Sequence, residues 1–192
     1  GDFDLNRTWD KIVDEEYILY VGSLRPHKNL PNLIRAFCSF KVQSNNNMKL
    51  VIVGVDANED INILQQIPKN IADDIYFLGS VSDSELASLY QHATLFCYPS
   101  LYEGFGIPPL EAMGFGTPVI ASNRASIPEV VGDAALLFDP ECVSDIVDSM
   151  MTVVNDAEVR QSLCDKGKQR YKNFSWKKTA DQTLSVYRSL LG

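Results

Sequence analysis

The chain has 192 residues, of which 45% are hydrophobic and 22% charged, the composition of an ordinary soluble globular protein. Its formal net charge of −8 argues against nucleic acid as a partner, because binding a phosphate backbone requires a basic face. The sequence contains neither a signal-peptide pattern nor an apolar run of about 20 residues, so its own signals predict a cytoplasmic protein.

Six short apolar runs, each closed by glycine, proline or polar residues, predict β-strands. They cover residues 17–21, 49–53, 75–78, 95–98, 118–121 and 134–138. Runs that are apolar at every position are typical of strands buried on both faces, as in a parallel sheet covered by helices.

Helical patterns alternate with these runs. They begin at residue 29, near residue 60, at residue 82 with the polar residues of an N-cap, and at Pro108. From Ser144 onward only helical signal remains, in three segments broken near Asn155 and around residues 173–175. The fold class predicted is therefore α/β, a Rossmann-like doubly wound parallel sheet of about six strands with C-terminal helices.

Ligands of such sheets bind beyond the carboxyl ends of the strands, which directs attention to the loops. The loop after the first strand reads Gly22-Ser23-Leu24-Arg25-Pro26-His27-Lys28-Asn29. Arg25 and Lys28 lie just ahead of a helix N-terminus, where a phosphate or diphosphate would bind. The alternative is that both cations are solvated and that Asn29 is a plain N-cap. The loop lacks the pattern of a Walker phosphate loop.

The loop after the third strand reads Gly79-Ser80-Val81-Ser82. Its backbone groups are placed to hydrogen-bond a planar base lying over the strand ends. A tight turn leading into a capped helix explains the same residues, and local signals favour that simpler interpretation.

The loop after the fourth strand contains two glutamates, Glu103 and Glu111, separated by glycines and prolines. Carboxylates repel phosphates but accept strong hydrogen bonds from hydroxyls. A nucleotide-sugar has hydroxyls on its ribose and on its hexose with the diphosphate between them, so one glutamate can hold each sugar. Gly104 and Gly106 would bring backbone N–H groups to the charged middle. The simpler alternative is a loop followed by a capped helix.

Other side chains carry less chemical signal. The two histidines, His27 and His92, are expected to be an exposed loop residue and a helix C-terminal cap. The aromatic residues of the last helices are expected to pack in the core: Tyr171, Trp176 and Tyr187. The cysteines have no metal-ligand or disulfide spacing, so reduced thiols and no bound metal or cofactor are expected: Cys38, Cys97, Cys142 and Cys164.

The three loops, in this order, resemble the C-terminal domain of GT-B glycosyltransferases of family 4, the retaining "glycosyl transferases group 1". The resemblance extends from about Tyr17 to Leu191. Its most specific motif is Glu-x7-Glu within S-L-Y-E-G-F-G-I-P-P-L-E-A-M, supported by G-T-P-V-I-A-S from Gly116 and P-E-V-V-G-D-A-A from Pro128. The first loop is similar to the mannosyltransferase subgroup.

The resemblance implies a role for each matching residue. Glu103 would contact the donor hexose, Glu111 the ribose hydroxyls, and Lys28 with a nearby arginine the diphosphate. Backbone groups would complete the donor site, with Val81 at the base: Gly22, Ser23, Phe105, Gly106 and Ile107. Relatives place an arginine where this chain has Ser23, so Arg25 is expected to substitute.

The resemblance also implies retaining transfer from a nucleotide-diphosphate sugar without a required metal, with GDP-mannose the preferred donor and a UDP-sugar next. Residues 1–16 would link to an N-terminal domain that binds a glycan or lipid-linked acceptor in polysaccharide biosynthesis. Residues 17–175 would bind donor, and residues 176–192 would return toward that domain. The isolated domain would be inactive, and the whole protein would associate peripherally with the inner face of the cytoplasmic membrane.

Two other functions remain open on the sequence. One is a nucleotide-sugar binding module that lacks catalysis, which the intact Glu103, Glu111 and Lys28 argue against. The other is a different GT-B enzyme, such as a nucleotide-sugar epimerase or a phosphorylase, although no pyridoxal-phosphate lysine is identifiable.

Overall fold

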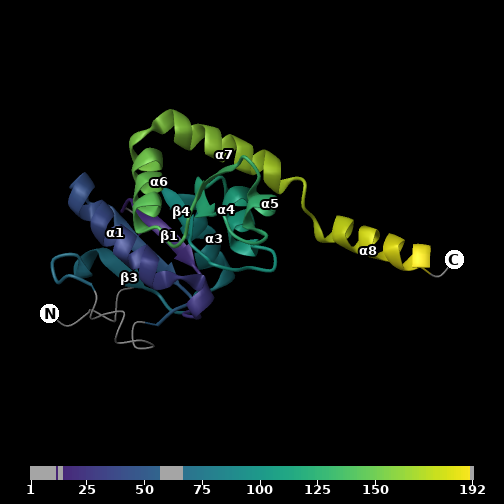
Figure 1. Cartoon of the computed structure of the whole chain (residues 1–192), viewed down its shortest axis with the longest axis horizontal. Helices are drawn as coiled ribbons and strands as arrows, with labels where there is room; N and C mark the ends of the chain where they lie inside the picture. Colours follow the sequence, from purple (N-terminus) through teal and green to yellow (C-terminus); the bar gives the residue numbers. More distant parts are fainter. Residues whose placement is uncertain (1–11, 13–14, 57–66, 191–192) are drawn as a thin grey trace.

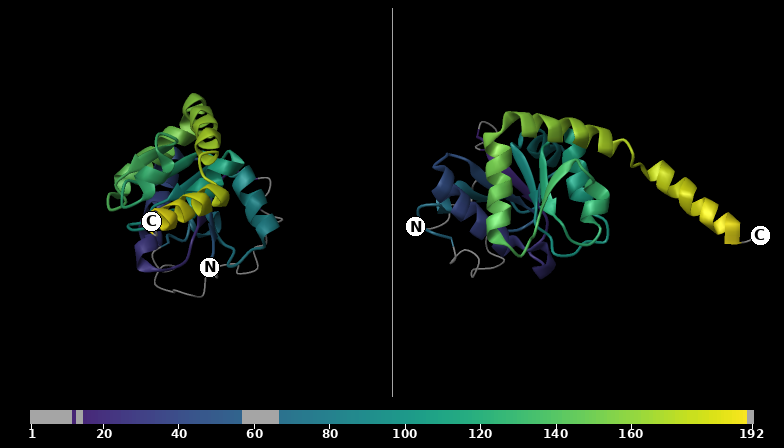
Figure 2. Two further views of the ribbon diagram at one scale, coloured as in Figure 1. Left: turned by 90° about the vertical axis from the view of Figure 1, so that its right-hand side faces the viewer. Right: turned by 45° about the horizontal axis from the view of Figure 1, so that its top comes forward.

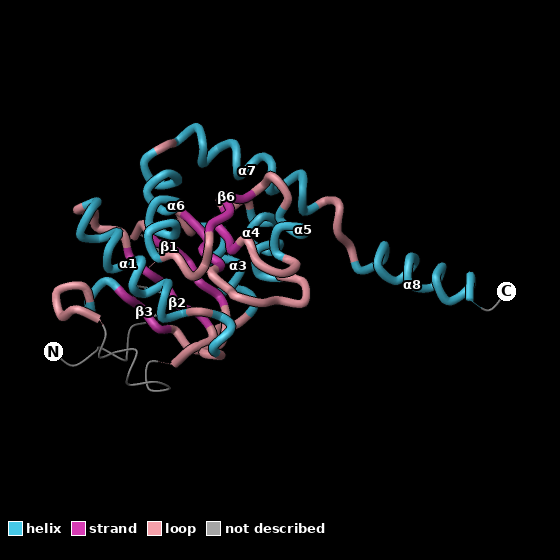
Figure 3. The backbone as a smooth tube through the Cα atoms, in the orientation of Figure 1, coloured by secondary structure: helices cyan, strands magenta, loops and turns pink. Residues whose placement is uncertain are grey.

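A computed structural model of the chain describes residues 12, 15–56 and 67–190. Its centre is one six-stranded sheet in the order β3-β2-β1-β4-β5-β6, and every neighbouring pair is parallel. The strands are β1 (Tyr17–Val21), β2 (Lys49–Val53), β3 (Ile75–Phe77), β4 (Leu95–Tyr98), β5 (Val119–Ser122) and β6 (Ala135–Phe138). The predicted doubly wound sheet is confirmed (Figure 3). The ends of three strands differ by one residue from the prediction.

The direction of winding reverses between β1 and β4. The chain adds β2 and β3 on one side of β1, then crosses to place β4, β5 and β6 on the other side. In open α/β sheets the loops that leave the carboxyl ends of the strands on either side of such a reversal diverge to opposite faces, so the ligand crevice is expected between the loops after β1 and β4. This topology puts the first and third of the predicted loops on either side of the same crevice.

Seven α-helices and two short 3-10 turns connect and follow the strands in the described residues. They are a 3-10 turn at Pro26–Lys28, α1 (Leu30–Ser44), a 3-10 turn at Ala72–Asp74, α3 (Asp83–His92), α4 (Ile107–Phe115), α5 (Ile127–Val131), α6 (Val143–Asn155), α7 (Ala157–Tyr171) and α8 (Trp176–Leu190). The helix predicted from residue 60 lies outside the described residues. The predicted breaks near Asn155 and residues 173–175 are confirmed.

Helices cover both faces of the sheet (Figure 1). Ile18 and Tyr20 belong to a core cluster shared with α1 and α6, whereas Tyr17 and Leu19 belong to a second cluster shared with α3, α4 and α5. All four side chains are fully buried. Burial on both faces explains why the strands are apolar at every position rather than at alternate ones.

The last two helices lie outside this two-faced arrangement. α7 packs against α4 so closely that a Cβ atom on Gly167 would lie 3.1 Å from Met113 Cγ. α8 has no buried residue and projects away from the domain (Figure 2). The predicted core packing of Tyr171, Trp176 and Tyr187 is therefore wrong, since these side chains are 46%, 82% and 61% exposed. Amphipathic spacing identifies an apolar face but not what covers it.

Candidate functional site

Three glycines fix the starts of the loops after β1, β2 and β3. The Gly22 amide donates to the Val53 carbonyl at 3.0 Å, and the Gly54 amide donates to the Gly79 carbonyl at 2.7 Å. Gly54 has a φ of +86°, and a Cβ atom there would lie 2.7 Å from the Gly22 carbonyl oxygen. Only glycine permits this approach without strain, so the three loops leave the sheet as one packed edge.

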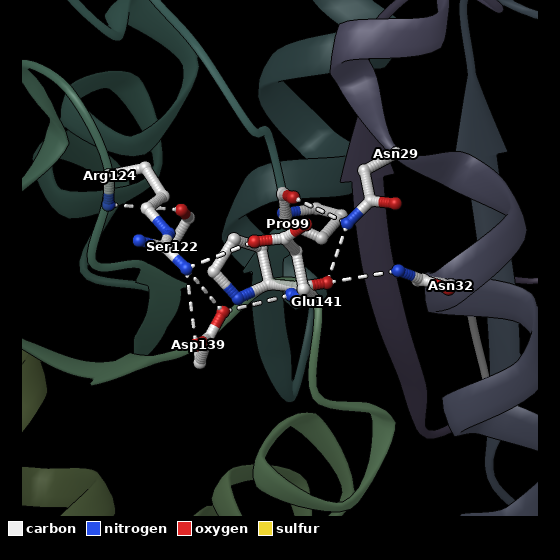
Figure 4. Close-up of polar contacts among 8 residues, drawn as sticks. Asn29, Asn32, Pro99, Ser122, Arg124, Asp139 and Glu141 are labelled. Atoms are coloured by element: carbon white, nitrogen blue, oxygen red, sulfur yellow. Dashed lines mark hydrogen bonds and ion pairs between the residues drawn. The ribbon is translucent and has the colours of Figure 1, made fainter.

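The first loop forms a 3-10 turn at Pro26–Lys28 and then passes through Asn29, which is left-handed at φ 59°. Asn29 is the N-cap residue of α1, as the alternative interpretation expected, but its side chain makes no capping hydrogen bond to the helix. Its side chain instead donates to the carbonyls of Pro99 at 3.1 Å and Pro140 at 2.8 Å (Figure 4). These bonds join the loop after β1 to the loops after β4 and β6.

Lys28 and Glu103, 75 residues apart, meet across the crevice. Lys28 Nζ lies 2.6 Å from Glu103 Oε1 and donates to the hydroxyl of Tyr98 at 3.2 Å. The two charged side chains are only 16% and 13% exposed, and Tyr98 is fully buried. The structure therefore brings together the predicted cation and the predicted acid, on a tyrosine that sequence reasoning missed.

The surroundings set the ionisation of this group. Burial would raise the pKa of the Glu103 carboxyl, but hydrogen bonding to Lys28 and to neighbouring hydroxyls, together with the Lys28 charge, outweighs it and lowers the pKa below its ordinary value. Burial, together with the Glu103 charge, raises the pKa of Tyr98 and also that of Tyr20. At neutral pH a carboxylate thus lies beside neutral hydroxyls and one ammonium group.

The second predicted glutamate, Glu111, lies in α4 and is held from α3. Tyr90 donates its hydroxyl proton to Glu111 Oε2 at 3.1 Å, and its ring stacks on Phe115 at a centroid distance of 5.6 Å. Burial and the nearby Glu111 charge raise the pKa of Tyr90. Tyr90 therefore acts as a fixed, neutral donor that orients the carboxylate. No local sequence signal distinguishes it from an ordinary core tyrosine.

The stretch between the glutamates presents unpaired amides. Gly106, at φ 109°, is the N-cap of α4, and the amides of Phe105, Gly106 and Ile107 make no hydrogen bond to any described residue. The Ser126 hydroxyl lies 2.9 Å from the carbonyl oxygens of both Glu103 and Phe105 and donates to them. Free amides at a helix N-terminus attract anions, and Ser126 holds the carbonyls of the same loop.

The other residues predicted for the site make few contacts with this group. Arg25 is exposed, and in the part of the chain that the structure describes its guanidinium forms no hydrogen bond or ion pair. The Ser23 carbonyl accepts a hydrogen bond from the Tyr20 hydroxyl at 3.1 Å. Val81 is half-buried against the core cluster under α3. The structure therefore joins Lys28 to Glu103 but does not join Arg25 to either.

A second arginine near the strand ends, Arg124, is paired with two carboxylates through one terminal nitrogen. Its guanidinium donates to Asp139 at 3.0 Å and to Glu141 at 3.1 Å, which links the loops after β5 and β6 (Figure 4). Its amide donates to the buried Ser122 hydroxyl at 3.1 Å. Two carboxylates thus neutralise the Arg124 charge. Glu103 is paired with Lys28 instead.

Residues 12, 15–56 and 67–190 contain neither a cluster of metal-ligating side chains nor a membrane-spanning helix. No three His, Cys, Asp or Glu side chains there are grouped closely enough to hold a metal ion. No helix within those residues has the length and apolar character required to cross a bilayer.

Comparison with known proteins gives consistent matches. The family model described as glycosyl transferases group 1 matches residues 3–170. O-antigen chain mannosyltransferase B of Escherichia coli is 38% identical over 175 residues, which are 91% of this chain and 46% of that protein. MMP alpha-(1->4)-mannosyltransferase of Mycolicibacterium hassiacum is 32% identical over 170 residues, 86% of this chain and 41% of that protein. The chain thus spans less than half the length of these relatives.

Solved structures agree on the fold. Sucrose-phosphate synthase from Thermosynechococcus elongatus superposes with a TM-score of 0.79 at 28% identity, covering 93% of this chain and 46% of that one. The C-terminal domain of a glycosyl transferase group 1 family protein from Francisella tularensis superposes with a TM-score of 0.71 at 24% identity, covering 85% and 88%. The family model and the identity to these relatives show that the chain belongs to the glycosyl transferases group 1 family.

Proposed function

We propose that this chain is the donor-binding domain of a retaining hexosyltransferase and that its donor is a nucleotide-diphosphate sugar, GDP-mannose before a UDP-sugar. The observation that carries the proposal is the Lys28–Glu103 pair, held at 2.6 Å across the β1–β4 crevice. Beside it lie the free amides at the start of α4. A cation and amides suit a diphosphate, and a carboxylate suits sugar hydroxyls.

Each part of the donor then has a partner. Lys28 and the amides of Phe105, Gly106 and Ile107 hold the diphosphate, with Arg25 a second cation from the same loop as Lys28. Backbone groups of Gly22 and Ser23 line its path, and Val81 contacts the base. Tyr90 fixes one oxygen of Glu111, and the other oxygen accepts from the ribose. Once Lys28 binds phosphate, the Glu103 carboxylate accepts hydrogen bonds from the hexose hydroxyls.

The chemistry follows from where charge develops. In the transfer step the bond between the anomeric carbon and the diphosphate oxygen breaks, and the acceptor oxygen bonds to that carbon from the same face. The acceptor proton passes to the departing diphosphate oxygen. Lys28 and the α4 N-terminus stabilise the negative charge that accumulates on the diphosphate, which is electrostatic catalysis. This route needs no metal ion and retains the anomeric configuration.

The preference for mannose comes from the relatives named above, two of which are described as mannosyltransferases. We assign residues 1–16 to a linker, residues 17–175 to the donor domain and residues 176–192 to a returning segment. The acceptor, a glycan or lipid-linked sugar, binds an N-terminal domain of the whole protein, which works at the inner face of the cytoplasmic membrane. The isolated chain binds donor and transfers little sugar.

Calorimetric titration of the chain with GDP, UDP and ADP tests the proposal, followed by GDP-mannose and UDP-glucose. The expected result is saturable binding of GDP, at least about tenfold tighter than that of the other two nucleotides, a difference of about 1.4 kcal/mol. Preferential binding of UDP would support the proposed donor site but show that its base is uracil and not guanine. Failure of all three nucleotides to bind would overturn the proposal.

A further inference from the structure

The loop that carries Glu103 has little rigidity of its own. A Cβ atom on Gly104 would meet nothing within 4 Å, so no neighbour packs against that side of the residue. Gly106 has a φ of +109°, a conformation that other residues rarely adopt. Phe105 lies between these two glycines with its side chain 43% exposed. The direction of the Phe105 and Gly106 amides must therefore be fixed by contacts from outside the loop.

One such contact comes from residue 174, at the junction of α7 and α8. The ring of Phe174 meets the ring of Phe105 edge to face, with centroids 5.8 Å apart and planes inclined by 80°. The guanidinium of Arg170 lies over the Phe174 ring at 5.2 Å from its centroid. Edge-to-face rings and a cation over a ring face are both attractive arrangements, so the three side chains form a stack that ends on the loop.

Arg170 is itself held in place. Its Nε donates to the Val130 carbonyl at 2.8 Å, and a terminal nitrogen donates to the Glu129 carbonyl. Both carbonyls belong to α5, a helix of five residues, and face the end where helix carbonyls lack internal partners. Arg170 therefore ties α7 to the C-terminal end of α5.

The other end of α5 holds the same loop. Ser126, which precedes α5, donates to the carbonyls of Glu103 and Phe105 at 2.9 Å. Two routes thus lead from Arg170 to Phe105, one through the Phe174 ring and one through α5 and Ser126. They converge on the residue whose amide, with those of Gly106 and Ile107, has no partner in the described chain.

We propose that Arg170 and Phe174 are positioning residues for the loop of residues 103–107, which we call the donor loop. They hold the Phe105 peptide so that the free amides at the start of α4 keep one direction. Their role at the site rests on the proposed function, because those amides matter only if an anionic donor binds them. Phe174 lies two residues before α8, which buries nothing here. Any contact that fixed α8 would therefore also affect the position of the loop, through Phe174.

The first test requires no ligand. Nitrogen-15 relaxation of the full chain reports the order parameters of the Phe105 and Gly106 amides, which are about 0.85 in a rigid backbone and below about 0.6 in a flexible one. We expect rigid values in the wild type and in Phe174→Tyr, which keeps the ring, and flexible values in Phe174→Leu and Arg170→Lys. Trp176→Leu is the matched control, because Trp176 is 82% exposed. Unchanged order parameters in Phe174→Leu would overturn the inference.

The second test links the stack to the donor. Phe174→Leu should weaken GDP binding at least fivefold in the same chain, while Phe174→Tyr and Trp176→Leu bind as the wild type does. Equal affinity of Phe174→Leu and the wild type would refute the positioning role. Failure of the wild type to bind any nucleotide would refute the proposed function instead, whereas the relaxation result would still decide whether the stack fixes the loop.

Discussion

Lys28 and Glu103 form an ion pair that is largely withdrawn from solvent, with exposures of 16% and 13%. Removing two charges from water costs free energy that their attraction offsets only in good geometry, so such a pair is not an efficient source of stability. Its location at the crevice, on the hydroxyl of Tyr98, is better explained by a role in ligand binding.

Replacing Lys28 with methionine keeps the apolar stem but removes the charge. If Lys28 contacts the diphosphate, the variant should bind GDP about tenfold more weakly, or about 1.4 kcal/mol, and bind guanosine almost unchanged. The matched control is Lys172→Met, because Lys172 is an exposed lysine at the C-terminal cap of α7. Titration of each variant with both compounds gives the answer, and equal losses for GDP and guanosine would argue against a phosphate contact.

Replacing Glu103 with glutamine should destabilise the fold at neutral pH by about 1–3 kcal/mol, because Lys28 would keep its burial and lose its counter-charge. The folded-state pKa of Glu103 lies below its ordinary value of 4.5, so the carboxylate stabilises the fold above that pH. Its contribution is lost as pH falls through the folded-state pKa. Urea unfolding should therefore show the gap between wild type and variant closing below pH 4.5. A gap that widens in acid would contradict the pairing.

At the scale of elements, the sequence allowed prediction of the strands and most helices but not of α5. The strands were accessible because burial on both faces leaves uninterrupted apolar runs. α5 has only five residues, too few to show helical periodicity, although Pro128 and Glu129 at its start and Gly132 after its end are helix-boundary signals. Ser126 uses its hydroxyl on the donor loop. Ser126 thus bonds to the loop between the two glutamates and makes no capping bond to α5.

The glycines at the strand ends allow a test of the packed edge. Gly54→Ala should cost about 1–3 kcal/mol, because alanine at a φ of +86° is strained and its Cβ would press on the Gly22 carbonyl. Gly104→Ala is the matched control, since a Cβ there meets open space, and it should change stability by less than about 0.5 kcal/mol. Urea denaturation of both variants decides, and equal midpoints would show that the edge tolerates a side chain.

At the scale of the whole molecule, sequence reasoning proposed the two glutamates and the lysine as site residues but did not predict their partners. Tyr98 and Tyr90 lie 70 and 21 residues from the side chains they contact, and their local patterns indicate only burial. The same limit explains the error at Trp176 and Tyr187: apolar spacing on α8 requires a partner surface, and the described chain supplies none. Contacts between elements that are distant in the sequence depend on the topology of the fold, and the local spacing of apolar residues carries no information about that topology.

α8 offers a direct prediction about cooperativity. A chain ending at Ser175 should unfold within about 2 °C of the full chain, because α8 contributes no buried side chain to either core cluster. Thermal unfolding followed by circular dichroism measures this difference. A drop of 10 °C or more would mean that α8 packs on the domain, contrary to the structure described here.

The most direct test of the donor site compares GDP with its 2′,3′-dideoxy analogue in the wild type, in Glu111→Gln and in the surface control Glu158→Gln. Glutamine keeps an acceptor for the Tyr90 hydroxyl but removes the charge proposed to bind the ribose. We predict that the wild type and the control bind GDP about tenfold more tightly than the analogue, and that Glu111→Gln binds the two alike. Discrimination that persists in Glu111→Gln, or that is absent from the wild type, would contradict the assignment of this crevice as a nucleotide-sugar site.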